Sequence, residues 1–223
     1  MSKNYYSLGL MSGTSMDGVD ASIIYSDGTS KYKAILNKYF VYNEDFYQDL
    51  TSLRDKINSF KDLKRLSNDL KSIEKEITLF HAKVVNEMIR ESNIDIDFIG
   101  FHGQTIFHNA DEKISRQLGD GKLLSQFTKK TVVYNFREND LNNGGEGAPL
   151  SPIFHQLIVK ENKIDLPVCV LNIGGIANIT AIGSNEPKDL KSYDIGPGNC
   201  LIDEWIRKKT KKKYDDNGQT AKA

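Results

Sequence analysis

The N-terminal segment reads YSLGLMSGTSMDGVDASIIY from Tyr6 to Tyr25. Apolar residues occupy both of its ends, and the residues between them are small or polar. This pattern predicts two short strands joined by a turn. Residues 31–42 have a similar strand-like pattern. The chain is therefore expected to open with a meander of three strands.

Helix and strand patterns alternate after this opening. Apolar residues from Leu63 to Met88 recur at steps of three and four. They predict one amphipathic helix of about seven turns, with His81 at its surface or cap. Ile96–Phe101 and Thr131–Asn135 read as strands that end in polar segments. Because strands alternate with helices, the sequence predicts an α/β sheet.

A second strand–glycine–strand pattern begins near residue 166. Val168–Ile173 and Ile176–Ile182 are apolar and flank a Gly-Gly pair, which echoes the arrangement of the first hairpin. A further strand end at 192–195 and a helix from Asn199 to about Lys208 follow. The sequence therefore predicts two α/β domains, residues 1–165 and 166–223.

Charge and hydropathy exclude some classes of protein. The 223 residues carry 30 Lys+Arg and 30 Asp+Glu, so the formal net charge is zero, which argues against a broad nucleic-acid surface. The basic run Arg207–Lys213 is expected to be a solvated helix end. No apolar run reaches the roughly 18–20 residues of a membrane span, and no signal peptide is recognisable. We expect a cytoplasmic protein without nucleic-acid or membrane partners, with Cys169 and Cys200 free.

The turn at residues 13–20 is a candidate phosphate site. Its glycines allow close approach of a ligand, and hydroxyls beside backbone N–H groups suit phosphate oxygens. Two carboxylates, Asp17 and Asp20, are candidate ligands of Mg²⁺. The lysine of a Walker P-loop is absent, and an ordinary hairpin turn is the alternative. The candidate residues are Gly13, Thr14, Ser15, Met16, Asp17, Gly18, Val19 and Asp20.

The second half of the chain supplies a matching turn and a candidate base. Asn172, Gly174 and Gly175 form a second candidate phosphate turn between strands. Asp194 ends a predicted strand, just before the turn Gly196-Pro197-Gly198. Ligand sites of α/β sheets gather at strand ends, and a carboxylate there can accept a proton. Capping of the turn is the alternative role for Asp194.

Two further segments supply candidate substrate contacts. Gln104 and Thr105 follow the strand at 96–101 and carry groups suited to sugar hydroxyls. Arg137 lies at another strand end with Asp140, where it contacts an acidic substrate or forms a structural ion pair. A zinc site at His102 is not expected, because no Cys or second His lies at ligand spacing.

Taken in order, these blocks resemble the anhydro-N-acetylmuramic acid kinase family. The resemblance spans about residues 8–221 and implies a fold of the superfamily of sugar kinases, heat-shock chaperone ATPases and actin, with ATP between two ribonuclease H-like α/β lobes. The matching blocks are GLMSGTSMDGVD (9–20), GQT (103–105), NFREND (135–140), GGEGAPL (144–150), LNIGG (171–175), DIGPGN (194–199) and YDDNG (214–218).

The resemblance also implies an activity. Such enzymes use ATP, Mg²⁺ and water to open the bridge of 1,6-anhydro-N-acetylmuramic acid and phosphorylate O6, in peptidoglycan recycling. It implies that Asp194 is the general base and that residues 13–20 and 172–176 hold phosphates. Gln104, Thr105 and Arg137 are implied sugar contacts, and the family suggests a homodimer.

Length separates this chain from the family pattern. Family members are considerably longer and have a late Gly-Gly-Gly segment that receives adenosine, whereas this chain ends soon after Tyr214. We therefore expect one complete lobe and the beginning of a second, truncated before the adenosine motif. Two alternatives stay open, namely a kinase for another 1,6-anhydrosugar and a non-catalytic sugar-binding module.

Overall fold

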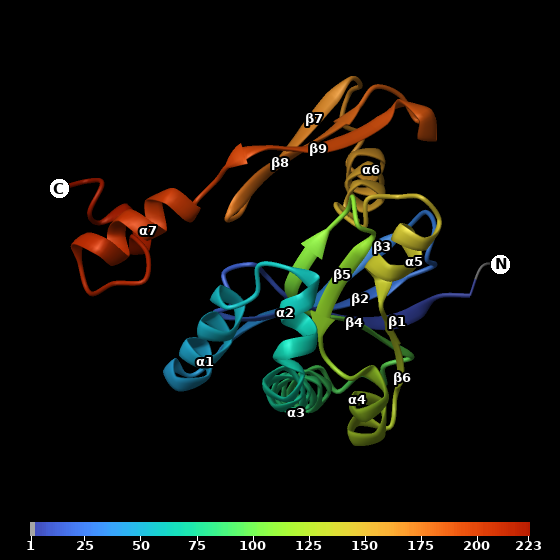
Figure 1. Ribbon diagram of the computed structural model, residues 1–223. Coiled ribbons are helices and arrows are strands. Elements are labelled where there is room, and N and C mark those ends of the chain that lie inside the picture. Colours follow the sequence, from blue (N-terminus) through green and yellow to red (C-terminus); the bar gives the residue numbers. More distant parts are fainter. Residues whose placement is uncertain (1–2) are drawn as a thin grey trace. The chain divides into compact units, whose positions relative to one another are not determined.

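The computed structural model describes residues 3–223 and divides the chain into two compact units (Figure 1). The first unit ends at Ala148 and the second begins at Pro149. The predicted boundary at residues 165/166 lies further along the chain. The difference arises because helix α6 (Pro152–Glu161) packs on strands of the second unit.

Unit 1 is built on a mixed sheet of six strands in the order β3-β2-β1-β4-β5, with β6 also paired to β4. The first three strands are antiparallel, and β4 runs parallel to both β1 and β6. This confirms the predicted meander and the predicted α/β sheet, and it shows that the sheet is mixed. The strands are β1 (Tyr5–Ser12), β2 (Gly18–Ser26), β3 (Tyr32–Val41), β4 (Phe98–Asn109), β5 (Ile114–Leu118) and β6 (Thr131–Tyr134).

Most helices of unit 1 pack on one face of this sheet, and Phe136 of the last helix lies against Gly100 on the other face. The predicted single helix is two helices, because Leu66 leaves the helical conformation at φ −97° and ψ 21°. The spacing of apolar residues hardly changes across one such residue, so the pattern could not show the break. The helices are α1 (Glu44–Asp55), α2 (Phe60–Arg65), α3 (Ser67–Ser92), α4 (Gly121–Thr128) and α5 (Phe136–Asn142).

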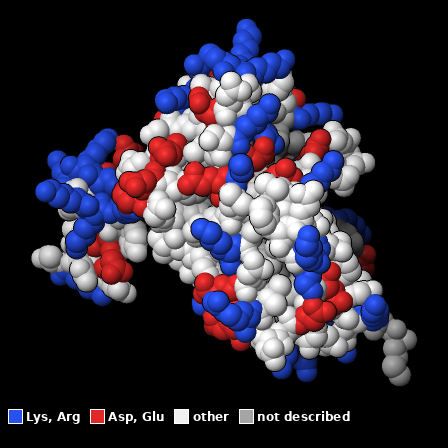
Figure 2. Space-filling model, turned by 90° about the horizontal axis from the view of Figure 1, so that it is seen from below, with Lys and Arg blue, Asp and Glu red and all other residues white. Residues whose placement is uncertain are grey.

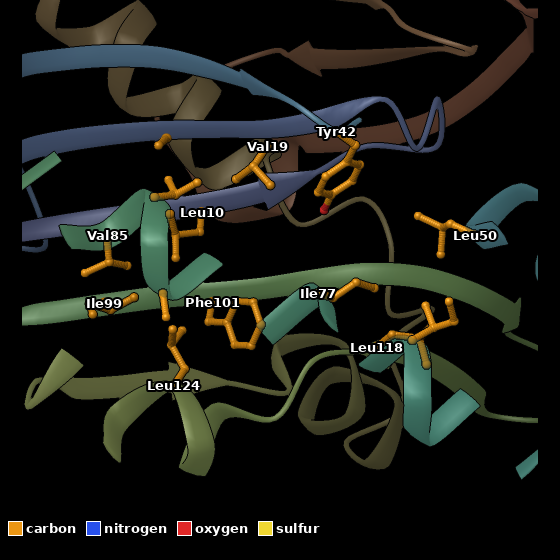
Figure 3. Close-up of a cluster of buried hydrophobic side chains, with 14 of the residues drawn as sticks. Leu10, Val19, Tyr42, Leu50, Ile77, Val85, Ile99, Phe101, Leu118 and Leu124 are labelled. Carbon is orange, nitrogen blue, oxygen red and sulfur yellow. The ribbon is translucent and has the colours of Figure 1, made fainter. Parts of the chain in front are cut away.

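The core of unit 1 lies between the sheet and α1, α3 and α4 (Figure 3). His81 of α3 belongs to this core and is 0% exposed, so its predicted surface position is wrong. Its Nδ1 donates to the Ile77 carbonyl at 2.8 Å, and its ring packs 4.9 Å from the ring of Phe101. Among the described residues, His81 Nε2 has no hydrogen-bond partner. Burial lowers the pKa of His81 to about 4.

We expect unit 1 to lose stability as the pH falls below 6.5, and His81→Phe to reduce that loss. Between pH 6.5 and 4 the unfolded chain binds a proton at residue 81 that the folded chain does not. The free energy of unfolding therefore falls by about 1.4 kcal/mol per pH unit from this group. Urea unfolding at pH 7.5 and pH 5 measures the effect. The exposed His108→Phe variant is the control, and an equal pH dependence in both variants would contradict the assignment.

Unit 2 contains an antiparallel sheet in the order β7-β8-β9, two α-helices and short 3₁₀ helices at 187–189 and 216–218. Helix α6 covers one face, where His155 Nδ1 lies 2.8 Å from the Thr180 hydroxyl. On the other face, the paired residues Leu171, Ile179 and Tyr193 form an apolar row, and Leu171 and Tyr193 are 53% and 55% exposed. The remaining elements are β7 (Val168–Ile173), β8 (Ile176–Ile182), β9 (Leu190–Pro197) and α7 (Cys200–Lys209).

Charged side chains of both signs are interspersed on the face drawn in Figure 2. The basic run begins in the last turn of α7, as predicted for a helix end. In the part of the chain that the structure describes, no helix has the length and apolar character needed to cross a membrane. Cys169 and Cys200 are both free.

Candidate functional site

The turn between β1 and β2 is anchored by a buried residue. Met16 is only 2% exposed and adopts a positive φ of 59°. Its N–H donates to the Gly13 carbonyl at 3.1 Å, which closes the turn. Thr14 and Ser15, which directly precede this anchor, are exposed, and the Ser15 hydroxyl donates to the Asp17 carboxylate. The turn thus holds one side chain in the core and presents hydroxyls to solvent.

Gln104 fixes this turn to β4 and is not a surface residue. Its Oε1 accepts from the Ser12 hydroxyl at 2.6 Å, and its Nε2 donates to the Gly13 carbonyl at 2.9 Å. Ser12 also lies 3.2 Å from the Tyr42 hydroxyl, and burial raises the pKa of Tyr42 to about 12. The Gln104 side chain is 0% exposed. A direct sugar contact by this amide, as the sequence suggested, therefore conflicts with its position.

We expect Gln104→Leu to lower the free energy of unfolding by about 2 kcal/mol, because two hydrogen bonds of a buried amide are lost. These bonds join Gln104 to the Ser12 hydroxyl and to the Gly13 carbonyl. Chemical denaturation measures the change. Gln48→Leu is the matched control, since Gln48 is exposed on α1 and bonds only across one helical turn, to Glu44. Equal stability of the two variants would contradict a supporting role for Gln104.

Two carboxylates accompany the turn. Partial burial, and then the negative charge of Asp17, raise the pKa of Asp20. Such a pair attracts a cation, and Mg²⁺ is commonly held by one or two carboxylates together with phosphate oxygens and water. Across residues 3–223, no cluster of three or more acidic, His or Cys side chains is arranged to hold a metal ion. Asp17 and Asp20 are two carboxylates, which is fewer than such a cluster contains.

A β-bulge in β4 sets the direction of His102. Leu10 pairs with Phe101 and Ser12 with Gln104, so β4 has one residue more than β1 between these pairs. Gly103 in the bulge has a φ of +70°, which a glycine adopts without strain. A Cβ at this position would lie 2.4 Å from the Leu118 carbonyl oxygen. The bulge therefore requires glycine beside His102.

Arg137 bonds to His102 from the neighbouring helix α5. Arg137 Nε donates to His102 Nε2 at 3.0 Å, and Nη1 donates to the Gly147 carbonyl at 2.7 Å. Burial lowers the pKa of Arg137. Gly147 N–H in turn donates to the Asp140 carboxylate at 2.7 Å, so the glycine-rich loop is tied to α5. The ion pair between Arg137 and Asp140, one of the two alternatives from the sequence, does not form; the carbonyl and N–H of Gly147 link the two side chains instead.

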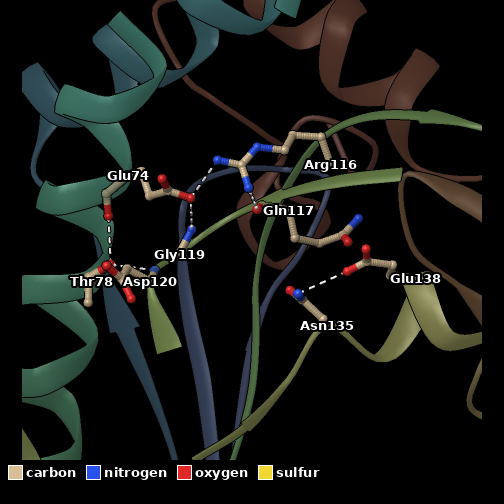
Figure 4. Close-up of polar contacts among 8 residues, drawn as sticks. All are labelled: Glu74, Thr78, Arg116, Gln117, Gly119, Asp120, Asn135 and Glu138. Carbon is tan, nitrogen blue, oxygen red and sulfur yellow. Dashed lines mark hydrogen bonds and ion pairs between the residues drawn. The ribbon is translucent and has the colours of Figure 1, made fainter. Parts of the chain in front are cut away.

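Polar contacts fix the segments around this pair. Figure 4 shows the Glu74 carboxylate between Arg116, at 2.7 Å, and the Gly119 N–H, at 3.1 Å. These bonds tie α3 to the connection between β5 and α4. At the start of α5, Asn135 has a φ of 59°, and its amide donates to Glu138 at 3.0 Å. Thr105, by contrast, is only half-buried, and its hydroxyl accepts from Gln117 at 3.3 Å.

In unit 2, the strand register places three polar residues in a row. Asn172 pairs with Asn178, which pairs with Asp194, so the three side chains lie on one face of the sheet. A bulge at Ile195 follows immediately, because Ala177 pairs with Gly196. Bulges often re-aim side chains at functional sites. Sequence reasoning singled out Asn172 and Asp194, but the register adds Asn178 between them.

The Gly-Gly turn of unit 2 packs on the start of α7. Asn199 N–H donates to the Gly174 carbonyl at 2.7 Å, and Gly198 N–H donates to the Gly175 carbonyl at 2.9 Å. A Cβ at Gly198 would lie 2.3 Å from the Gly174 carbonyl oxygen. The two glycine segments that flank Asp194 and Asn172 are therefore held together by backbone contacts.

Comparison with known proteins decides the family. Residues 5–223 match the family model described as anhydro-N-acetylmuramic acid kinase. The chain belongs to the anhydro-N-acetylmuramic acid kinase family. A curated kinase of this name from Pelagibacter ubique (strain HTCC1062) is 63% identical over 99% of this chain and 59% of that protein. Another, from Agrobacterium fabrum, is 40% identical over 96% of this chain and 58% of that protein.

The chain thus spans 59% and 58% of the length of these two anhydro-N-acetylmuramic acid kinases. Among solved structures, a PPX-GPPA enzyme of Aquifex aeolicus aligns with a TM-score of 0.43 and 12% identity. That alignment covers 92% of this chain and 56% of the other.

Within each unit, the structure brings part of the predicted kinase site together. Unit 1 joins the turn at residues 13–20 to Gln104 and joins Arg137 to His102. Unit 2 aligns Asp194 with Asn172. The sequence favoured His102 neither as a sugar contact nor as a zinc ligand. Its contact with Arg137 depends on the bulge at Gly103, which a sequence pattern does not reveal.

Proposed function

We propose that the protein is an ATP-dependent kinase that opens 1,6-anhydro-N-acetylmuramic acid with water and phosphorylates O6, giving N-acetylmuramic acid 6-phosphate in peptidoglycan recycling. Family membership supports the substrate and the reaction. The structural observation that supports the proposal is the exposed carboxylate of Asp194. It lies in a row with the amides of Asn172 and Asn178, next to a β-bulge. We further propose that the two units correspond to one lobe and part of a second lobe of an actin-like ATPase.

Asp194 is proposed to begin the reaction. Its carboxylate accepts a proton from water as the water oxygen bonds to the anomeric carbon. The bond from that carbon to O6 breaks, and its electron pair goes to O6. An ether oxygen is a poor nucleophile, but the released O6 is able to attack the γ-phosphorus of ATP, and ADP leaves. Asn172 and Asn178 lie in the same row of the sheet as this base and place their amide groups beside it.

The glycine turns are proposed to hold the nucleotide. In unit 1, residues 13–20 offer backbone N–H groups and the hydroxyls of Thr14 and Ser15 to phosphate oxygens. Asp17 and Asp20 would hold Mg²⁺, which would supply positive charge against the phosphates. In unit 2, Asn172, Gly174 and Gly175 form the second phosphate turn. Phosphoryl transfer depends mainly on this positioning and charge stabilisation.

Thr105 and Arg137 are the proposed sugar contacts. Thr105 is half-buried and carries a hydroxyl that also accepts from Gln117. Arg137 has a guanidinium whose charge favours an acidic group such as the lactyl carboxylate of muramic acid. Gln104 is proposed to support the phosphate turn from below rather than to contact the sugar.

A coupled assay of ADP release tests the function. Anhydro-N-acetylmuramic acid, Mg²⁺ and ATP are supplied to the 223-residue chain, and levoglucosan replaces the sugar in a parallel reaction. Release of ADP with the muramic sugar supports the proposal, whereas preference for levoglucosan indicates a kinase for another anhydrosugar. Sugar binding without turnover by this chain indicates a binding module. Light scattering tests the proposed homodimer, and cell fractionation tests a cytoplasmic location.

A further inference from the structure

Arg137 carries a largely buried charge without a counter-ion. Within residues 3–223, none of the ion pairs involves Arg137, and the only cause that lowers its pKa is burial. Its two protein partners, His102 Nε2 and the Gly147 carbonyl, are both uncharged acceptors. Burial of an unpaired charge is costly, so such a site favours a ligand that brings the opposite charge.

The contacts of Arg137 leave one part of the guanidinium available. The group has five N–H donors, of which Nε and one Nη1 donor are used. No hydrogen bond to the described residues involves Nη2. A carboxylate binds two parallel N–H groups of a guanidinium well. The donors on Nη1 and Nη2 that remain are suited to this geometry.

The chemistry of His102 explains why its side chain leaves the charge uncompensated. His102 Nδ1 lies 2.7 Å from the Gly103 carbonyl, which is only an acceptor, so Nδ1 carries the proton. Nε2 is then a lone-pair acceptor for Arg137 Nε. Burial, and then the charge of Arg137, lower the pKa of His102 to about 4. The imidazole is thus neutral near pH 7 and orients Arg137 without cancelling its charge.

We propose that His102 is a positioning residue that, as a neutral acceptor, holds Arg137 so that its outer N–H groups bind a substrate carboxylate. This inference rests on the proposed sugar kinase function and adds a determinant of specificity to it. An acidic side chain at position 102 would instead form an ion pair with Arg137 and neutralise its charge. A neutral acceptor at position 102 therefore leaves Arg137 able to bind an anion, whereas an acidic residue there would form a structural ion pair with it.

Two sugars that differ in the carboxylate test this role. Binding of 1,6-anhydro-N-acetylmuramic acid and 1,6-anhydro-N-acetylglucosamine, which lacks the lactyl group, is measured by calorimetry on the 223-residue chain. We expect the native chain to prefer the acidic sugar by about tenfold or more. His102→Gln supplies another neutral acceptor and should keep the preference, whereas His102→Glu should abolish it.

Matched variants separate positioning from a general structural role. His108→Gln and His108→Glu carry the same changes at an exposed position of the same strand, and thermal melts verify that all four variants are folded. Retained preference in His102→Glu would overturn the proposal. So would an equal loss of affinity for both sugars in both His102 variants.

If neither sugar binds, ¹⁵N NMR still tests the hydrogen bond between His102 and Arg137. The absence of sugar binding would count against the proposed function, but it would leave the arrangement of these two residues to be measured. We expect a Nδ1-protonated imidazole and an Arg137 Nε proton that exchanges slowly with solvent. The slow exchange should persist in His102→Gln and disappear in His102→Leu. Its absence in the native chain, or its survival in His102→Leu, would overturn the proposal.

Discussion

Asp194→Asn is expected to lower kcat for anhydro-N-acetylmuramic acid by at least about 10³-fold, because a carboxamide does not accept the proton of the attacking water. The change replaces one oxygen by an NH₂ group and keeps the size of the side chain. Asp194 is exposed, so the free energy of unfolding should hardly change. Sugar binding should also persist, and this separates loss of the chemical step from loss of the site. Turnover is measured as ADP release, and binding by calorimetry.

A matched control defines what this result means. Asp165→Asn makes the same substitution at another exposed position of unit 2, outside its strands and helices, and should leave kcat unchanged. If Asp194→Asn retained turnover, Asp194 would not be the base, and Asn178 and Asn172 would lose their proposed role beside it. If the variant lost sugar binding as well, Asp194 would be a binding group rather than a base.

Much of the fold follows from local patterns. The apolar residues on either side of residues 12–18 predicted the first hairpin. The apolar runs on either side of Gly174-Gly175 predicted the second. The break between the helices at Leu66 was not predicted, because the spacing of apolar residues hardly changes across it. The burial of His81 was not predicted either, since an imidazole counts as polar in a periodicity argument but packs well against Phe101.

The candidate site shows where sequence reasoning stops. The glycine turns were identified correctly, but Gln104 and Thr105 lie inside β4, and Asp194 lies inside β9, rather than at strand ends. The contacts of these residues depend on register and burial. Gln104 looked like a sugar contact, yet its pairing with Ser12 buries its amide against the turn at residues 13–20. The row of Asn172, Asn178 and Asp194 depends on which residues of β7, β8 and β9 stand opposite one another. Such pairings are non-local and have no signature in a single segment.

Gly103→Ala is expected to destabilise unit 1 by about 3 to 4 kcal/mol, the largest loss of stability among the variants considered. Two costs add at this position. An alanine is strained at a φ of +70°, and its Cβ would lie 2.4 Å from the Leu118 carbonyl oxygen. That oxygen belongs to the backbone of β5, so relief requires β4 or β5 to move. Urea unfolding of the variant measures the loss.

Gly28→Ala isolates the two costs. Gly28 has a similar φ of +76°, but no atom lies within 4 Å of the position of a Cβ there. It should therefore lose only the conformational part, about 1 kcal/mol. The difference between the variants measures the close approach of β4 and β5 at the bulge. Because that approach sets the direction of His102, Gly103→Ala should also weaken the bond to Arg137, whereas Gly28→Ala should not. Equal losses of stability would show that β5 yields easily and that the bulge does not hold His102 in place.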